Sequence, residues 1–266
     1  RSVWALAVAN VISTAVTVAI GHLMLPRHRH RLAMDRDAAK SLIHFGRWIL
    51  LSTLATYLGG EGLKAIQGGL LSPAEFGVLA IAYTIAGIPN ELAARLSSSL
   101  GLPVLAETYR NAPEAARSVL SSLRKRTVII SLFLFTSVIF VSEPAIELLY
   151  DPRYHEAAKY IAVLCLSSAV STIGLGYISS ILAIGLSSLY FYIMLMTFAI
   201  RSAGLFLGFE IDGILGMLYG VALSSSLIFI ATWVAAKKLK ISNTLLDSIS
   251  MAYIVCLGMF YFNSAQ

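Results

Sequence analysis

Hydrophobic residues occur in this sequence as long uninterrupted runs rather than in the short alternating patterns of soluble helices and strands. Three stretches contain no Asp, Glu, Lys or Arg: residues 2–26, 160–200 and 213–236. A helix that crosses the hydrocarbon core of a bilayer needs about 20 predominantly apolar residues, so each stretch is long enough for at least one crossing. The pattern predicts an all-α fold, a polytopic transmembrane helix bundle.

Turn residues and charges divide the chain into about eight predicted helices. The uncharged run 160–200 would be about 60 Å long as one helix at 1.5 Å per residue, so it must fold back. The Gly-Leu-Ser-Ser sequence at 185–188 is the expected turn. The eight expected ranges are about 3–25, 46–70, 74–108, 127–149, 159–184, 189–208, 213–236 and 246–263.

The composition supports a membrane protein and argues against a soluble enzyme. Only 13% of the 266 residues are charged and 58% are hydrophobic, with a mean hydropathy of +0.79, whereas soluble domains are about 25% charged. The two cysteines lie in apolar runs and indicate no disulfide framework. The sequence offers no metal-ligand spacing, no cofactor motif and no nucleophile motif, so we expect no metal, no cofactor and no enzymatic activity.

Basic residues gather in three alternate loops, which hold 14 of the 20 Lys and Arg residues. Cytoplasmic loops of membrane proteins carry an excess of Lys and Arg, so these loops should be cytoplasmic and both ends of the chain should face outward. This topological explanation is preferred over a nucleic-acid partner. The sequence begins with Arg1 and enters an apolar span at once, so we expect it to be a fragment with further residues upstream.

Charged residues within the predicted helices are the first candidates for a functional site, because a charge inside a membrane is costly. Glu61 and Lys64 lie three residues apart in the second predicted helix, and Glu91 and Arg95 lie four apart in the third. These spacings place each pair on one helix face. The pairs could simply neutralise themselves in the bundle interior, or they could line a wet cavity for a charged substrate. We favour the cavity.

Helix-breaking residues next to these pairs strengthen the cavity hypothesis. Gly59, Gly60 and Gly62 interrupt the second predicted helix and Pro89 lies within the third, and discontinuous helices often form transport sites. These four residues are candidate hinges. Arg201 is a further candidate for the cavity, but it lies six or seven residues from the outer end of its helix. It could instead extend its side chain to the lipid headgroups.

Small residues recur every four positions on two of the predicted helices, and such stripes let helix backbones approach closely in lipid. We expect them to serve packing in a tight bundle and to carry no information about the substrate. They are Ser168, Thr172, Gly176 and Ser180 on one helix and Gly216, Gly220 and Ser224 on the other.

Four segments carry a resemblance to a known family. Segment 45–50 (FGRWIL) follows a basic loop, and segment 71–82 (LSPAEFGVLAIA) has the form of a short turn that leads into a helix. Segment 103–107 (PVLAE) would end that helix, and segment 149–158 (LYDPRYHEAA) is similar to a turn of the form LYGPRYxxAA. In this order and spacing they resemble the polysaccharide (Wzx-type) flippases of the multidrug/oligosaccharidyl-lipid/polysaccharide exporter superfamily.

The resemblance implies two six-helix lobes that face each other across a central cavity. It implies translocation of a polyprenyl-pyrophosphate-linked oligosaccharide across a bacterial inner membrane by alternating access. The implied partners are this substrate, membrane lipid and other glycan-export components. The parts of the chain would be the last helix of a truncated first lobe (1–25), a basic cytoplasmic connector (26–45), the second six-helix lobe (46–240) and an accessory transmembrane helix (241–266).

The charges of the candidate residues agree only in part with an anionic substrate. The two pairs each sum to zero, which leaves Arg201 as the remaining positive charge. A cation-coupled multidrug exporter of the same superfamily is the main alternative, and it would be expected to have an acidic cavity. A membrane-embedded glycan transferase or ligase would need larger outer loops than this sequence predicts, and a scaffold subunit of an export complex is a further alternative.

Overall fold

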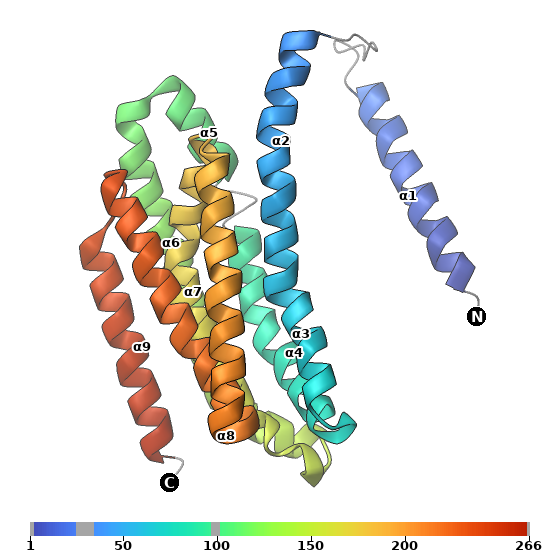
Figure 1. Cartoon of the computed structure of the whole chain (residues 1–266), viewed down its shortest axis with the longest axis vertical. Coiled ribbons are helices and arrows are strands. Elements are labelled where there is room, and N and C mark those ends of the chain that lie inside the picture. Colours follow the sequence, from blue (N-terminus) through green and yellow to red (C-terminus); the bar gives the residue numbers. More distant parts are fainter. Residues whose placement is uncertain (1–2, 25–34, 97–101, 265–266) are drawn as a thin grey trace. The chain divides into compact units, whose positions relative to one another are not determined.

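The computed structural model describes residues 3–24, 35–96 and 102–264, and the regular elements of these residues are all helices (Figure 1). The chain divides into two compact units, Arg1–Ile43 and His44–Gln266. The first unit contains α1 (Val3–Met24) and the start of α2 (Arg36–Tyr57). The all-α fold predicted from the sequence is therefore confirmed.

The second unit contains the helices that are long and apolar enough to cross a bilayer. Five candidate spans occur among the described residues. The apolar segment Val8–Gly21 of α1, in the first unit, is shorter than these spans. The remaining elements are the π segment η1 (Leu58–Gly62), α3 (Leu63–Leu70), α4 (Pro73–Leu96), α5 (Leu102–Asn111), α6 (Pro113–Leu149), η3 (Pro152–Tyr154), α7 (Ala157–Ala183), α8 (Ser187–Lys238) and α9 (Thr244–Ser264).

Two predicted helix starts need correction, because charged residues that were assigned to loops are helical. The second predicted helix begins at Arg36 instead of residue 46, and the fourth begins at Pro113 instead of residue 127. The range predicted as one helix over 74–108 falls in α4 and α5, and residues 97–101 between them lie outside the described part. Helices that extend beyond a bilayer carry charges in their outer turns, so the loss of apolar character does not mark their ends.

The 52-residue helix α8 consists of two arms that fold back on each other. Asp212 and Gly213 have non-helical backbone angles at the bend, and Gly213 has a φ of +52°, which favours glycine. Gly204 and Gly208 of the first arm pack directly against the backbone of the second arm, where any Cβ would collide with a carbonyl. The predicted separation into two helices near residues 209–212 is therefore confirmed, and so is the packing role of glycines in this region.

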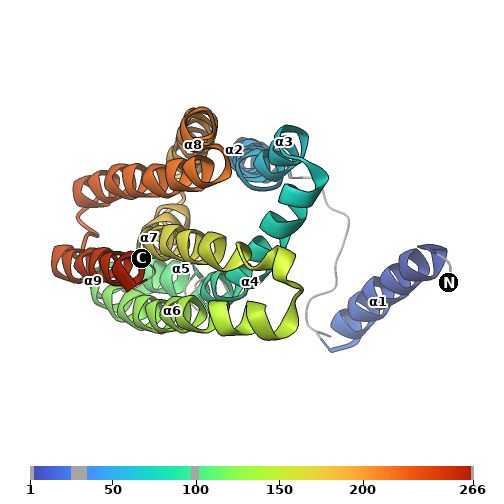
Figure 2. The ribbon, with the colours of Figure 1, turned by 90° about the horizontal axis from the view of Figure 1, so that it is seen from below.

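Helix α7 forms the centre of the second unit, with α6 and α8 on opposite sides (Figure 2). In its most apolar window 67% of the residues are buried, against at most 39% in the other four candidate spans. Its small residues allow this close packing on several sides, as the four-residue stripe predicts. The turn at its end is confirmed at Gly185, whose φ is +88°.

Two of the segments that suggested the family resemblance form hydrogen-bonded turns at one end of the unit. Before α4, the Ser72 N–H donates to Glu75 Oε2 (2.9 Å) and the Glu75 N–H donates to Ser72 Oγ (3.3 Å), which is a capping box. Before α7, Asp151 Oδ1 accepts from the Arg153 N–H at 3.2 Å. This hydrogen bond is the main reason that the pKa of Asp151 is lowered.

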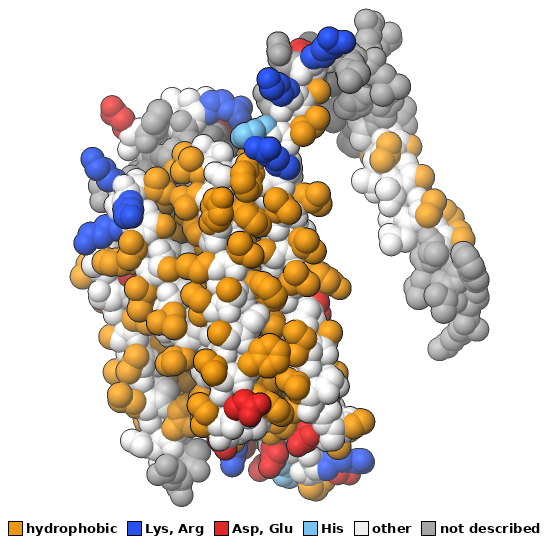
Figure 3. Space-filling model, viewed as in Figure 1, with side chains coloured by type: hydrophobic (Ala, Val, Ile, Leu, Met, Phe, Trp, Pro, Cys, Tyr) orange, Lys and Arg blue, Asp and Glu red, His pale blue; other side chains and the backbone are white. Residues whose placement is uncertain are grey.

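The surface has the banded pattern of a membrane protein (Figure 3). On the face of the second unit shown there, hydrophobic side chains cover the middle, Lys and Arg side chains gather at one end, and Asp and Glu side chains are concentrated at the other. A hydrogen bond from Asn243 Nδ2 to Ser121 Oγ (2.9 Å) joins the α8–α9 connection to α6, so two of the basic segments lie at the same end. The chain is a multi-pass membrane protein by these criteria.

We predict that the basic end faces the cytoplasm, because positive loops are retained on that side. In a Cys256→Ser background, a cysteine introduced as His155→Cys in the turn before α7 should react with a membrane-impermeant maleimide in spheroplasts. A cysteine introduced as Ser122→Cys should react only after the membrane is permeabilised. Both positions are exposed, so accessibility within the protein is matched. Labelling of Ser122→Cys in intact spheroplasts would reverse the orientation.

Candidate functional site

A cavity of about 310 Å³ lies between the π segment η1, α3, α4, α7 and α8. Apolar residues such as Leu63 and Leu164 form part of its wall, but polar groups converge on it from every one of these elements. A mostly preformed pocket with a few placed polar groups is the usual form of a small-molecule site. The polar side chains in its lining are Glu61, Lys64, Gln67, Tyr83, Asn90, Ser167, Ser168, Ser171 and Arg201.

The interruption predicted in the second helix takes the form of the π segment η1, which contains Gly59, Gly60 and Gly62. Three glycines in four positions weaken the α-helical preference of this stretch, and π segments inside helices occur frequently at functional sites. Gly59 and Gly60 line the cavity, and Gly59 lies against Phe198 of α8. A Cβ on Gly60 would meet no atom within 4 Å, so packing does not require a glycine there.

Glu61 and Lys64 line the cavity and form an ion pair, as their spacing predicted. Lys64 Nζ lies 2.8 Å from Glu61 Oε1, and the two side chains are 42% and 59% exposed, respectively. The Lys64 ammonium also lies 5.5 Å from the centre of the Tyr83 ring, within the range of a cation–π contact. Because the pair neutralises itself, it contributes no net charge to the cavity.

Arg201 lies in the lining of the same cavity on the α8 side. Its Nη2 donates to Ser171 Oγ at 3.3 Å, while its Nε is buried without a hydrogen-bond partner. Among the described residues no carboxylate forms an ion pair with it. Of the two alternatives left open by the sequence, the structure therefore places this side chain in the cavity, which has a net charge of +1.

A second cavity of about 180 Å³ adjoins the first and shares Gly59, Ser171 and Arg201 with it. Its remaining lining is mainly apolar and includes Ile178 and Phe229. The guanidinium of Arg201 thus stands between a polar compartment and a more apolar one. A ligand with an anionic group between a polar part and an apolar part would match this arrangement.

Uncharged polar residues in this site were missed by the sequence analysis. Gln67 is 1% exposed, and its Nε2 donates to the Tyr83 hydroxyl at 3.0 Å. Ser167 Oγ lies 2.9 Å from Ser225 Oγ. A usable signal was present for Gln67, because it continues the three-residue spacing of Glu61 and Lys64 along one helix face. We overlooked it because only formal charges were counted.

The second predicted pair is not brought together with the first. Glu91 and Arg95 are absent from the residues that line the cavity, and their side chains are 75% and 78% exposed. Arg95 Nη2 lies 3.8 Å from Glu91 Oε2. Both residues lie in the last two turns of α4, whereas the predicted helix 74–108 placed them nearer its middle. Pro89 is buried within α4, one residue before Asn90 of the cavity. A role of Glu91 and Arg95 in the site stays a prediction.

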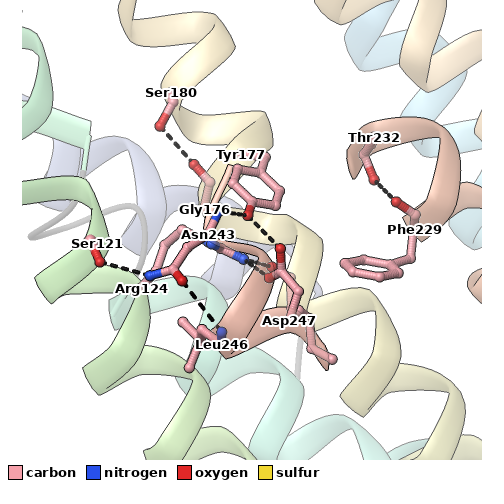
Figure 4. Close-up of polar contacts among 11 residues, drawn as sticks. Ser121, Arg124, Gly176, Tyr177, Ser180, Phe229, Thr232, Asn243, Leu246 and Asp247 are labelled. Atoms are coloured by element: carbon pink, nitrogen blue, oxygen red, sulfur yellow. Dashed lines mark hydrogen bonds and ion pairs between the residues drawn. The ribbon is translucent and has the colours of Figure 1, made fainter. Parts of the chain in front are cut away.

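A second polar cluster joins α6, α7 and α9, and none of it was predicted (Figure 4). Arg124 and Asp247 have side chains that are only 2% and 5% exposed, and Arg124 Nη2 lies 2.7 Å from Asp247 Oδ1. The Tyr177 hydroxyl donates to Asp247 Oδ2 at 2.6 Å and accepts from the Asn243 N–H at 2.8 Å. The Arg124 guanidinium also stacks on the Tyr177 ring, 3.6 Å from its centre.

This buried network fixes α9 to the rest of the unit. Arg124 reaches α7 as well, since its Nη2 donates to the Ile173 carbonyl at 2.8 Å. Gly176 provides the space, because a Cβ there would collide with the Arg124 side chain. From the sequence we expected Arg124 in a basic loop, whereas it lies within α6, and Asp247 was not singled out. The two residues are 123 positions apart, so no local pattern could pair them.

Comparison with known proteins gives a family match. The family model described as polysaccharide biosynthesis protein matches residues 1–159, and this range includes the π segment, α3, α4 and α6. A search of curated proteins and a search of solved structures found no match.

We predict that breaking the buried ion pair destabilises the protein strongly. Asp247→Leu leaves Arg124 buried without its carboxylate, and removal of one partner of a buried pair costs about 3–5 kcal/mol. The double variant Arg124→Met with Asp247→Leu removes both charges and should recover most of the lost stability. The measurement is the midpoint temperature of unfolding in detergent. Asp151→Asn, which removes an exposed paired carboxylate, is the control and should change little. Equal stability of Asp247→Leu and the wild type would contradict this role.

Proposed function

Because this chain belongs to the polysaccharide biosynthesis protein family, we propose that it carries a polyprenyl-pyrophosphate-linked oligosaccharide from the inner to the outer leaflet of a bacterial inner membrane. The lipid tail stays in the bilayer during this movement, and the polar headgroup passes through the protein. The proposed partners are this lipid-linked glycan, the surrounding lipid and other components of glycan export.

The observation that carries the proposal is the uncompensated charge of Arg201 within the cavity. A buried cation without a carboxylate is costly, so an anionic ligand would be bound favourably at this position. Arginine suits phosphate in particular, since its planar group of donors matches the oxygens of a phosphate. A pyrophosphate at Arg201 would have the polar compartment on one side and the apolar compartment on the other.

The part of the cavity wall formed by η1 has the features of a movable element. Alternating access needs a segment that changes its backbone conformation, and hinges are a few positions that absorb such a change. In this proposal Gly59, Gly60 and Gly62 allow η1 to change, while Pro89 weakens α4 at the same level because proline removes a helical hydrogen bond. The glycine-packed arms of α8 hold Arg201 in a fixed position.

A multidrug exporter for cations is the main alternative, and the electrostatics of the cavity disfavour it. Export of a cationic drug would be helped by a net negative site, whereas Glu61, Lys64 and Arg201 together give +1. A glycan transferase or ligase would need large outer loops. The turns around Ser72 and Asp151, which are outer turns in this proposal, are short.

We predict that Arg201→Gln strongly reduces transport without harming the fold. Charge-assisted hydrogen bonds contribute about 1.5–3 kcal/mol, so glycan export should fall about tenfold or more. The same change removes a buried charge that has no carboxylate partner, so the unfolding temperature should be equal to or above that of the wild type. Arg201→Lys keeps the charge but loses the paired donors, and it should keep part of the activity.

Export is measured by complementation in a strain that lacks the chromosomal copy, with the protein amount in the membrane determined in parallel. Arg153→Gln is the matched control, because it removes an arginine from an exposed turn. Full complementation by Arg201→Gln at normal protein amount would refute the proposed phosphate contact.

A separate prediction concerns Glu91 and Arg95, which we propose to extend the polar wall of α4 beyond Asn90. Glu91 follows Asn90 directly, and both charged side chains are exposed. The double variant Glu91→Gln with Arg95→Gln should reach the membrane in normal amount, because no buried charge is left behind, and should export less glycan. Full complementation by this neutral pair would assign the two residues to a structural role instead.

A further inference from the structure

Two buried polar atoms in the cavity have no hydrogen-bond partner. They are Gln67 Oε1, which is an acceptor, and Arg201 Nε, which is a donor. An unpaired buried polar group costs about 1–3 kcal/mol, and such groups are uncommon enough in native structures to need an explanation. Both residues line the same cavity, Gln67 from α3 and Arg201 from α8.

Gln67 is held in a defined position although one end of its amide is unused. Its Nε2 donates to the Tyr83 hydroxyl at 3.0 Å, and the residue as a whole is 1% exposed. Tyr83 is fixed in turn by the Lys64 ammonium over its ring. Two neighbouring side chains thus hold the Gln67 amide in place, as recognition of a specific hydrogen-bond donor requires.

The two unpaired atoms call for a ligand with an anionic acceptor at one point and an O–H or N–H donor at another. A phosphate group satisfies Arg201, but in a lipid-linked pyrophosphate both phosphates are ester-linked and carry no O–H, so the donor for Gln67 must come from the attached sugar. A sugar attached to a phosphate satisfies both, because its ring carries hydroxyl or acetamido groups next to the phosphate. The cavity volume of about 310 Å³ lies within the usual range for such a ligand.

We propose that Gln67 Oε1 accepts a hydrogen bond from the sugar directly attached to the pyrophosphate, and that Gln67 thereby determines which first sugar is transported. This inference rests on the proposed function and adds a specificity-determining residue to it. A site built to bind a hydroxyl discriminates strongly against an analogue without it, because the protein acceptor is then left unpaired.

The test measures protection of a cavity cysteine in the full chain. In a Cys256→Ser background, Ser168→Cys places a thiol in the cavity lining, and its reaction with a maleimide is followed in detergent. The probes are galactose 1-phosphate, N-acetylglucosamine 1-phosphate, their monodeoxy analogues, inorganic phosphate and a short-chain polyprenyl-pyrophosphate sugar. The variants are Gln67→Met, Gln67→Glu and Arg201→Gln.

In the protein that retains Gln67, we expect the sugar phosphate that lacks one particular donor to protect the cysteine about tenfold less well or worse. A tenfold factor corresponds to about 1.4 kcal/mol. In Gln67→Met this penalty should disappear, while protection by inorganic phosphate stays unchanged. Gln67→Glu retains acceptor oxygens and should keep the penalty, although its negative charge weakens binding of every phosphate. Arg201→Gln should lose protection by all the probes.

Two results would overturn the inference and can be told apart. If the lipid-linked sugar protects the cysteine but no deoxy penalty is removed by Gln67→Met, the transport proposal stands and the role of Gln67 is wrong. The role of Gln67 is also wrong if the deoxy penalty persists in Gln67→Met and disappears in Gln67→Glu. If neither phosphate nor the lipid-linked sugar protects the cysteine, the proposed function fails and the inference fails with it.

Discussion

The cost of placing a charge in an apolar environment governs the arrangement of this bundle. Arg124 and Arg201 are largely withdrawn from the surface, and they differ in whether a carboxylate neutralises their charge. Arg124 is neutralised by Asp247 and covered by the Tyr177 ring, so its charge is used to join helices. Arg201 lies in a cavity without a carboxylate partner among the described residues. Since an uncompensated cation lowers stability, its retention is best explained by a ligand that supplies the missing negative charge.

The backbone of the site departs from a regular α-helix in two places, the bend of α8 and the segment η1. Within a bilayer every peptide group must find a partner inside the protein, so departures from the α-helix are confined to a few places. At the bend of α8, Gly213 adopts an angle that other residues rarely adopt, and the two arms then pack glycine against backbone. Across the cavity, η1 replaces α-helical hydrogen bonds by π-type ones in a stretch with three glycines. In the proposed mechanism, Arg201 holds the anion while the glycines of η1 allow that segment to change conformation.

The polar groups of the cavity explain how a site with a single net charge can be selective. Charge attracts any phosphate, whereas the buried amide of Gln67 distinguishes ligands by their hydrogen-bond donors. The network around Asp247 has a different purpose, because its carboxylate oxygens are both occupied by protein donors. The two clusters show that burial alone does not identify a functional polar residue. Arg124 Nε and Nη1 are also buried without a hydrogen-bond partner, but the charge of Arg124 is neutralised by Asp247 and Arg124 lines neither cavity. Gln67 and Arg201 differ because their unpaired groups belong to residues that line a cavity.

The sequence by itself determined the membrane class, the all-helical fold, the family and the approximate position of most helices. These properties depend on local composition: the length of apolar runs, the turn at Gly185, and the glycines of η1, all of which act through neighbouring residues. It also identified Glu61 and Lys64, whose partners are one helical turn away. The tertiary structure alone decided that Arg201 faces a cavity instead of the headgroups, and that Arg124 meets Asp247 across 123 positions. Such pairings depend on which helix faces meet, and a pattern of period 3.6 within each helix does not specify its neighbour.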